Sequence, residues 1–156
     1  PALVDRINHF KELGKNNQKG EISKERFHKA TALLKLDVLK LDLSMYRYKN
    51  VLTALENAKR ISSYPPEAWF YLGEAYRQRG SQGDNELAVK AYREAITKLP
   101  EFAPAYRALA VHHLKKMQYQ DSENYFAKYL NCEPNAQDRA YVLKYINELN
   151  NKADSP

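Results

Sequence analysis

The chain has 156 residues, enough for one domain with a sizeable core, and its 44% hydrophobic content disfavours a disordered protein. Only 12 residues are Gly or Pro, which disfavours a strand-and-turn architecture, and a single cysteine, Cys132, excludes an intramolecular disulfide. The net charge of +6 lies in residues 1–63, where 13 Lys and Arg face 7 Asp and Glu. A basic half favours an acidic partner, although these charges are interspersed as on an ordinary solvated helix.

The first third of the chain is expected to be helical. Residues 1–31 are predicted to form an N-terminal extension of one or two helices, divided by the turn sequence GKNNQKG. Residues 32–65 then begin with a leucine-rich helix in which Leu34, Val38, Leu41 and Met45 share one face at steps of three and four. The sequence MYRYKNVLTALENA after it parallels KMQYQDSENYFAKY at residues 116–129, which indicates a faint repeat.

The next segment, residues 66–102, has the strongest pattern. Its first half has a Trp, a Leu-Gly pair and a Tyr at steps of three and four, and its second half has an Ala, a Tyr and a Pro: Trp69, Leu72, Gly73, Tyr76, Ala88, Tyr92 and Pro100. Between the halves, RGSQGDN includes three additional residues and is predicted to form a turn at Gly80, Gly83, Asp84 and Asn85.

Residues 103–136 repeat this order without an insertion. Here the corresponding positions hold Tyr106, Leu109, Ala110, His113, Ser122, Phe126 and Pro134, the last of which follows Pro100 by 34 residues. Residues 137–150 are predicted to form a capping helix with Ala140, Leu143 and Tyr145 or Ile146 in one stripe. Residues 151–156 are predicted to be a flexible tail.

These spacings resemble the tetratricopeptide repeat, a 34-residue helix-turn-helix unit with the pattern W-x2-L-G-x2-Y…A-x3-F…P. The resemblance implies an all-α superhelix, or solenoid, of about three units at 32–65, 66–102 and 103–136. Most of the large rings would then be structural, and Gly73 would let a neighbouring helix come close. The predicted packing residues are Trp69, Leu72, Gly73, Tyr76, Ala88, Tyr92, Tyr106, Leu109 and Phe126.

The same resemblance implies a concave groove lined by the first helix of each unit. Carrying over the position after the Trp position and the steps beyond it gives the expected groove residues Leu36, Lys40, Phe70, Glu74, Arg77, Arg107, Val111, Leu114 and Lys115. Leu43 corresponds in the faint first unit. For Phe70 an alternative stays open, since its ring could instead pack against the preceding first helix.

The expected function is therefore a protein–protein interaction scaffold whose groove binds another protein or peptide with acidic and apolar groups. The Lys and Asn pattern of repeats that bind chaperone tails is absent at Leu36, Lys40, Phe70 and Glu74. The alternative is nucleic-acid or anionic-surface binding by the basic N-terminal half, and self-association through the N-terminal side is another. The resemblance favours a bacterial protein of the cytoplasm or cell envelope.

No catalytic motif accompanies the repeats, and we expect no enzyme activity, cofactor or metal. His112 and His113 are adjacent, so on a helix their side chains point about 100° apart and cannot easily bind one metal. His113 replaces the interior Tyr and is predicted to pack in the core, with His112 at the groove edge or in solvent. Cys132 is predicted to be a packing thiol, and no stretch of about 18 apolar residues predicts a membrane span.

Overall fold

The computed structural model describes residues 4–5, 8–9 and 24–153, and every regular element within these ranges is a helix, which confirms the all-α prediction. The predicted turn at residues 14–20 and the last residues of the tail, 154–156, lie outside the described residues. The labelled helices are α2 (Lys24–Ser44), α3 (Tyr48–Leu55), α4 (Ala58–Ile61), α5 (Ala68–Arg79), α6 (Asp84–Lys98), α7 (Ala103–Lys115), α8 (Tyr119–Cys132) and α9 (Arg139–Ala153).

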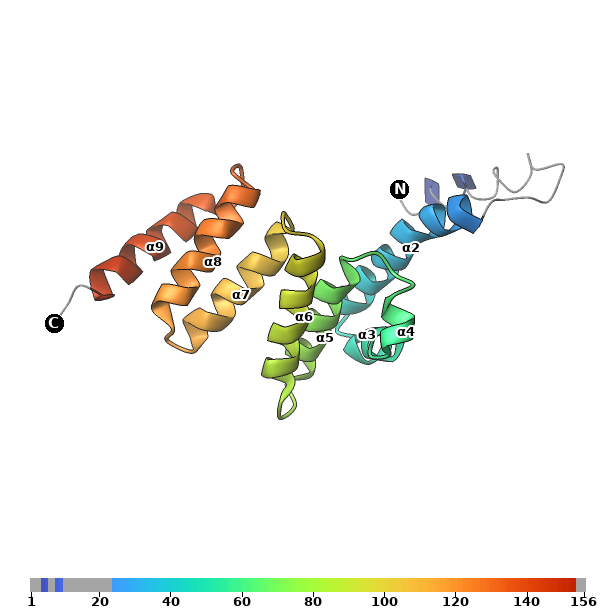
Figure 1. The fold of residues 1–156 in the computed structure, drawn as a ribbon, viewed down its shortest axis with the longest axis horizontal. Coiled ribbons are helices and arrows are strands. Elements are labelled where there is room, and N and C mark those ends of the chain that lie inside the picture. Colours follow the sequence, from blue (N-terminus) through green and yellow to red (C-terminus); the bar gives the residue numbers. More distant parts are fainter. Residues whose placement is uncertain (1–3, 6–7, 10–23, 154–156) are drawn as a thin grey trace.

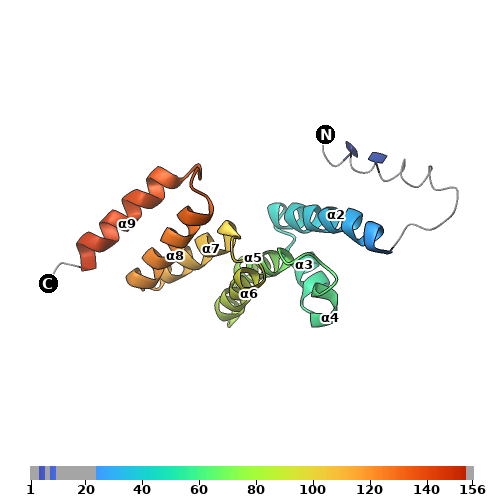
Figure 2. The same cartoon turned by 45° about the horizontal axis from the view of Figure 1, so that its top comes forward.

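Helices α5 to α9 follow one another in chain order along the long axis of the molecule, and α2, α3 and α4 lie together at the end opposite α9 (Figure 1). Helix α5 packs against α6, α7 against α8, and the two pairs meet through α6 and α7. Helix α9 covers α8 at one end, while α2 and α3 pack against α5 at the other. The turned view in Figure 2 shows the row to be bent, with α2 and α9 on one side and α6 on the other.

The N-terminal part differs from its predicted division. Helix α2 begins at Lys24 and crosses the boundary expected between residues 31 and 32, because no Gly or Pro interrupts residues 24–44. The predicted second helix of this unit is divided into α3 and the short α4. Asn57 starts α4, since its side-chain oxygen accepts a hydrogen bond from the Arg60 amide at 3.4 Å.

The turn between α5 and α6 occupies the predicted place. Gly80 and Gly83 both have positive φ, 63° and 83°, which explains two glycines in four residues. Asp84, however, lies in the first turn of α6, where its carboxylate accepts hydrogen bonds from Arg79 (2.9 and 2.7 Å) and from the Ser81 amide (2.8 Å). The Arg79 hydrogen bonds, helped by Ser81, outweigh burial and hold the pKa of Asp84 below its usual range.

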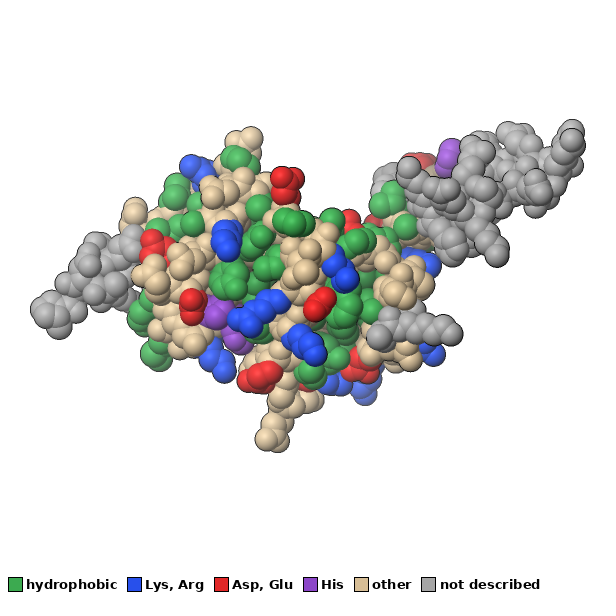
Figure 3. All heavy atoms as spheres, viewed as in Figure 1, with side chains coloured by type: hydrophobic (Ala, Val, Ile, Leu, Met, Phe, Trp, Pro, Cys, Tyr) green, Lys and Arg blue, Asp and Glu red, His purple; other side chains and the backbone are tan. Residues whose placement is uncertain are grey.

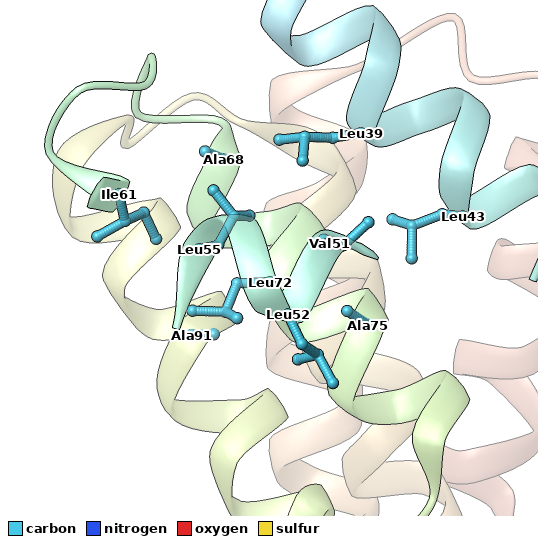
Figure 4. Close-up of a cluster of buried hydrophobic side chains, with 10 residues drawn as sticks. All are labelled: Leu39, Leu43, Val51, Leu52, Leu55, Ile61, Ala68, Leu72, Ala75 and Ala91. Carbon is cyan, nitrogen blue, oxygen red and sulfur yellow. The ribbon is translucent and has the colours of Figure 1, made fainter. Parts of the chain in front are cut away.

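One core cluster joins the N-terminal helices to the middle of the row. Figure 4 shows its side chains coming from α2, α3, α4, α5 and α6. Within the α5–α6 pair, Gly73 faces the ring of Tyr92, which is 2% exposed. A Cβ atom added at Gly73 would lie 2.6 Å from Cδ1 of Tyr92 and 3.1 Å from the Ala88 carbonyl oxygen. A side chain at residue 73 would therefore force the two helices apart.

In α2, the stripe picked out by the leucine pattern does not face this core. Val38, Leu41 and Met45 are each about half exposed, at 50%, 48% and 55%. The buried face is formed by Leu39 and Leu43, with Leu36 packed beside them. Helix α2 is apolar on two opposite sides, so periodicity predicted the helix and could not identify the side that packs.

Helix α9 shows a similar offset. Ala140 is exposed and Leu143 is 39% exposed, whereas Val142 is buried and Ile146 packs beside it. Residues 151–153, predicted as tail, continue this helix. None of the helices in the described part of the chain combines the length and the apolar character needed to cross a bilayer.

Candidate functional site

An apolar hollow of about 450 Å³ lies at the C-terminal end of the row, between α7, α8 and α9. We call it the α7–α9 groove. It brings together four of the nine residues predicted to line the concave surface, and Phe126 and three residues of α9 complete it. Its lining residues are Arg107, Val111, Leu114, Lys115, Phe126, Tyr141, Val142 and Tyr145.

The floor and one wall of the α7–α9 groove are fixed by packing. Phe126 and Val142 are 5% and 2% exposed, and they hold α8 and α9 together. Tyr141 is 59% exposed and lies one helical turn before Tyr145, with ring centroids 4.9 Å apart. The groove thus presents aromatic surface to solvent above a rigid apolar base, which is the usual composition of a binding site for an apolar side chain.

The two cationic residues of the groove differ in their availability. Arg107 donates a 2.7 Å hydrogen bond from Nε to Asp138, and the Tyr129 hydroxyl donates one of 2.6 Å to the same carboxylate. Burial opposes ionisation of Asp138, but these two hydrogen bonds outweigh it and hold its pKa below the usual range. Burial, together with Asp138, raises the pKa of Tyr129 to about 12. Lys115, in contrast, is exposed and has no ion pair within the described residues.

The predicted groove residues of α5 do not lie in this hollow. Glu74 accepts a 2.6 Å hydrogen bond from the Tyr92 hydroxyl and forms a 2.6 Å ion pair with Arg77. Burial, followed by the charge of Glu74, raises the pKa of Tyr92. Glu74 therefore provides the hydrogen-bond acceptor for the buried Tyr92 hydroxyl of α6. Arg77 is paired with Glu74 as well as being exposed to solvent.

Phe70 packs towards the following helices. Its ring lies 5.8 Å from that of Tyr92 and 5.5 Å from that of Phe102, which directly precedes α7. The ring is half-buried against the cluster of α6 and α7, and these contacts join α5 to both helices. In α2, Leu36 is half-buried against the core cluster and Lys40 is exposed.

Eight of the nine predicted packing residues lie in three clusters, and the ninth, Gly73, lies against the ring of Tyr92. Leu72 is buried with α2 and α3, while Trp69 and Tyr76 are half-buried beside it. The other members are in the two clusters around α6, α7 and α8: Ala88, Tyr92 and Leu109 in one, and Phe126 with the half-buried Tyr106 in the other.

The contribution of α9 was missed by sequence reasoning. Tyr141, Val142 and Tyr145 line the groove, whereas the sequence pattern predicts only a capping helix here. The aromatic pair at an interval of four residues was the available signal, since such residues share one face of a helix.

Several basic side chains of the N-terminal half bond within the protein. Arg47 forms a 2.8 Å ion pair with Asp42, and Lys35 donates a 2.9 Å hydrogen bond to the Ser63 carbonyl. Arg60 likewise donates one of 2.7 Å to the Thr53 carbonyl. These contacts reduce the number of free cations that a nucleic acid or anionic surface would meet there.

The two histidines and the cysteine considered for chemistry lie apart from the α7–α9 groove. His113 is 8% exposed, and His112 lines a separate hollow beside α6. Burial raises the pKa of the Cys132 thiol, which keeps it protonated and a poor nucleophile. Across the described ranges, no three or more His, Cys, Asp or Glu residues form a group that could hold a metal ion.

Comparison of the sequence with protein-family models gives no matching family, and comparison with curated proteins gives no match either.

Proposed function

We propose that this chain is a tetratricopeptide-like scaffold without catalytic activity, which binds a segment of a partner protein in the α7–α9 groove. The proposal rests on the repeat spacing in the sequence, on helices that pack in chain order along a bent row, and on the groove itself. The observation that carries it is an apolar hollow with the exposed ring of Tyr141 on its wall and the exposed ammonium of Lys115 among its lining.

The chemistry of the groove defines the partner segment. An apolar side chain of the partner would bury surface against Val111, Leu114 and Tyr141, at about 25 cal/mol per Å². A neighbouring carboxylate would pair with Lys115, because Arg107 is already bonded to Asp138. We therefore expect a short peptide with one bulky apolar residue beside an acidic one.

A peptide-display selection against the folded chain tests this function. Selected peptides should share an apolar residue next to Asp or Glu, and Tyr141→Ala should weaken their binding about tenfold or more, since an aromatic anchor contributes about 1.4 kcal/mol or more. The matched control is Tyr46→Ala, which removes a ring that is 78% exposed at the other end of the row. Equal affinity of the two variants would refute binding in this groove.

A charge reversal separates the ends of the row. Lys115→Glu should weaken the binding of an acidic peptide. Lys40 on α2 is also a predicted groove residue, but Lys40→Glu should leave the affinity of this peptide unchanged. Binding of the peptide that depends on Lys40 and not on Lys115 would move the site to α2 and contradict the proposal.

A further inference from the structure

A second hollow, of about 550 Å³, lies between α6 and α7 where α8 begins. We call it the α6–α7 hollow. Since helix residues are about 100° apart, His112, His113 and Lys116 lie on the other side of α7 from the α7–α9 groove. Figure 3 shows histidine atoms beside Lys, Arg, Asp and Glu side chains over α6 and α7. The lining residues are Glu86, Val89, Lys90, Arg93, Glu94, His112, His113, Lys116 and Gln118.

The α6–α7 hollow has a modest excess of positive charge. Three lining residues are cations and two are carboxylates. Lys116 approaches Glu86 only to 3.9 Å, and no carboxylate in the described part of the chain lies within 4.0 Å of Lys90 or Arg93. Burial, then the charges of His113 and Lys116, lowers the pKa of His112, as expected where positive potential gathers. Lys90 and Arg93 are thus available to an anion.

His113, which lines this hollow, also has a buried hydrogen-bonding atom without a partner in the described part of the chain. Its Nδ1 lies 2.8 Å from the Gln118 side-chain oxygen and 3.6 Å from an Asp121 carboxylate oxygen. Both neighbours are acceptors, so the proton of the neutral ring lies on Nδ1 and Nε2 carries a lone pair. Nε2 is buried and has no hydrogen-bond partner within the described residues. A ligand that donates a hydrogen bond here would relieve the cost of this unpaired atom.

The two features together select a class of ligand. The ligand must have negative charge for the cations and a hydrogen-bond donor for Nε2. Sulfate and carboxylates are acceptors only at neutral pH. A phosphomonoester has its second pKa near about 6, so close to neutral pH a fraction of it still has a P–OH beside its anionic oxygens. We propose that the α6–α7 hollow binds the phosphate group of a small phosphomonoester, with Lys90, Arg93 and Lys116 contacting its anionic oxygens and its P–OH donating to His113 Nε2.

Binding needs a small rearrangement. Because Nε2 is buried, a neighbouring side chain has to move before a phosphate oxygen reaches it. The ring of His112 is half-exposed and lies edge-on to His113 with centroids 5.5 Å apart, so it can turn into solvent. The ring of His113 itself is held by Gln118 and by stacking on Tyr125, with centroids 5.2 Å apart.

The test is an NMR titration at pH 7 and constant ionic strength with three probes: glycerol phosphate, inorganic phosphate and sulfate. The histidine ring nitrogens are followed by long-range ¹H–¹⁵N correlation, which reports the Nε2 of His113 directly. We expect saturable binding of both phosphates with a shift of this Nε2, and sulfate weaker by about tenfold, the value of one hydrogen bond to a charged group. Free phosphate that binds while glycerol phosphate does not would contradict a phosphomonoester as the ligand.

Two variants control for general electrostatics. Arg93→Gln in the hollow should weaken phosphate binding about tenfold. Arg139→Gln on α9 makes the same change of charge on an exposed residue and should leave the affinity for phosphate unchanged. Sulfate binding as tightly as phosphate, an equal loss in both variants, or no saturable phosphate binding would each overturn the proposal. None of these outcomes involves the α7–α9 groove, so the proposed peptide binding is tested separately.

Discussion

The N-terminal helices and the two central hairpins pack in different ways, although all three come from segments with related sequence patterns. In α5–α6 and α7–α8, two helices of similar length lie against each other. In the first segment, the 21-residue α2 is followed by an 8-residue helix and a 4-residue helix. The second half of each central hairpin is thus one long helix packed against the first, whereas in the first segment it is divided in two.

Specific residues explain this difference. Tyr92 of α6 fits against Gly73 and bonds to Glu74, and Ser122 of α8 donates a 2.9 Å hydrogen bond to the Ala110 carbonyl. The first segment, residues 32–65, has no glycine, and Asn57 starts a new helix within it. Sequence variation at a few interlocking positions therefore decides whether a hairpin is continuous.

The largest expected effect comes from a matched pair of core truncations. Leu109→Ala and Leu55→Ala remove side chains that are 0% and 1% exposed. Each should lower the free energy of unfolding by about 2–5 kcal/mol through lost burial and a cavity. We expect Leu109→Ala to reduce protection from amide exchange throughout α5–α8, and Leu55→Ala to reduce it mainly in α2–α4. Identical exchange patterns would show that the two regions unfold as one unit.

A smaller loss is expected from Gly73→Ala. The new methyl group would meet the Tyr92 ring, so the α5–α6 pair must separate slightly, at a cost of about 1–3 kcal/mol. Urea denaturation measures this loss of stability. In a protein that already has Tyr92→Leu, whose side chain is shorter, Gly73→Ala should cost less. A more stable Gly73→Ala protein would mean that helix propensity outweighs the close approach.

Tyr92→Phe keeps the ring and removes its hydroxyl. The lost hydrogen bond to Glu74 should cost about 1–1.5 kcal/mol, because Glu74 keeps its ion pair with Arg77. Tyr125→Phe is the control, since this half-buried hydroxyl has no hydrogen bond within the described residues. Chemical denaturation of both variants should show a loss only for Tyr92→Phe, and an equal loss would contradict the role of Glu74.

The last expected effect is a pH dependence at the turn of the α5–α6 hairpin, where the Asp84 carboxylate is bonded to Arg79. The pKa of Asp84 is lower in the folded protein than the value of about 3.9 in an unfolded chain. Its stabilisation is therefore complete above about pH 4 and is lost as the pH falls through the folded-state pKa. Asp84→Asn should be less stable than the parent at pH 7, and the two should converge in acid. Glu133→Gln, a substitution of an exposed carboxylate, is the control. A difference in stability between Asp84→Asn and the parent that does not change with pH would contradict the ion pair with Arg79.

Much of the helical content could be predicted because strong local signals agree. Gly80 and Gly83 mark a turn whose positive φ angles suit glycine, and the ring at Tyr92 requires the gap at Gly73. These effects act between neighbouring residues or within one hairpin, where the sequence pattern is informative.

The inward face of the terminal helices, and the availability of charged residues, could not be predicted. Helix α2 has apolar residues on two sides, and only the position of α3 and α5 determines that Leu39 is buried and Val38 exposed. Likewise Arg107 and Glu74 have the spacing of groove residues, but Arg107 is hydrogen-bonded to Asp138 and Glu74 to Tyr92. Such pairings depend on tertiary contacts across 31 and 18 positions, which periodicity does not specify.

The most direct test of the proposed binding site is NMR mapping with a peptide obtained by the display selection, added to the ¹⁵N-labelled chain. We predict that backbone shifts on saturation concentrate around Val111, Leu114, Lys115 and Tyr141 of α7 and α9, and leave α2 and α5 unchanged. Shifts confined to α2 and α5, with α7 and α9 unaffected, would contradict the groove as the binding site.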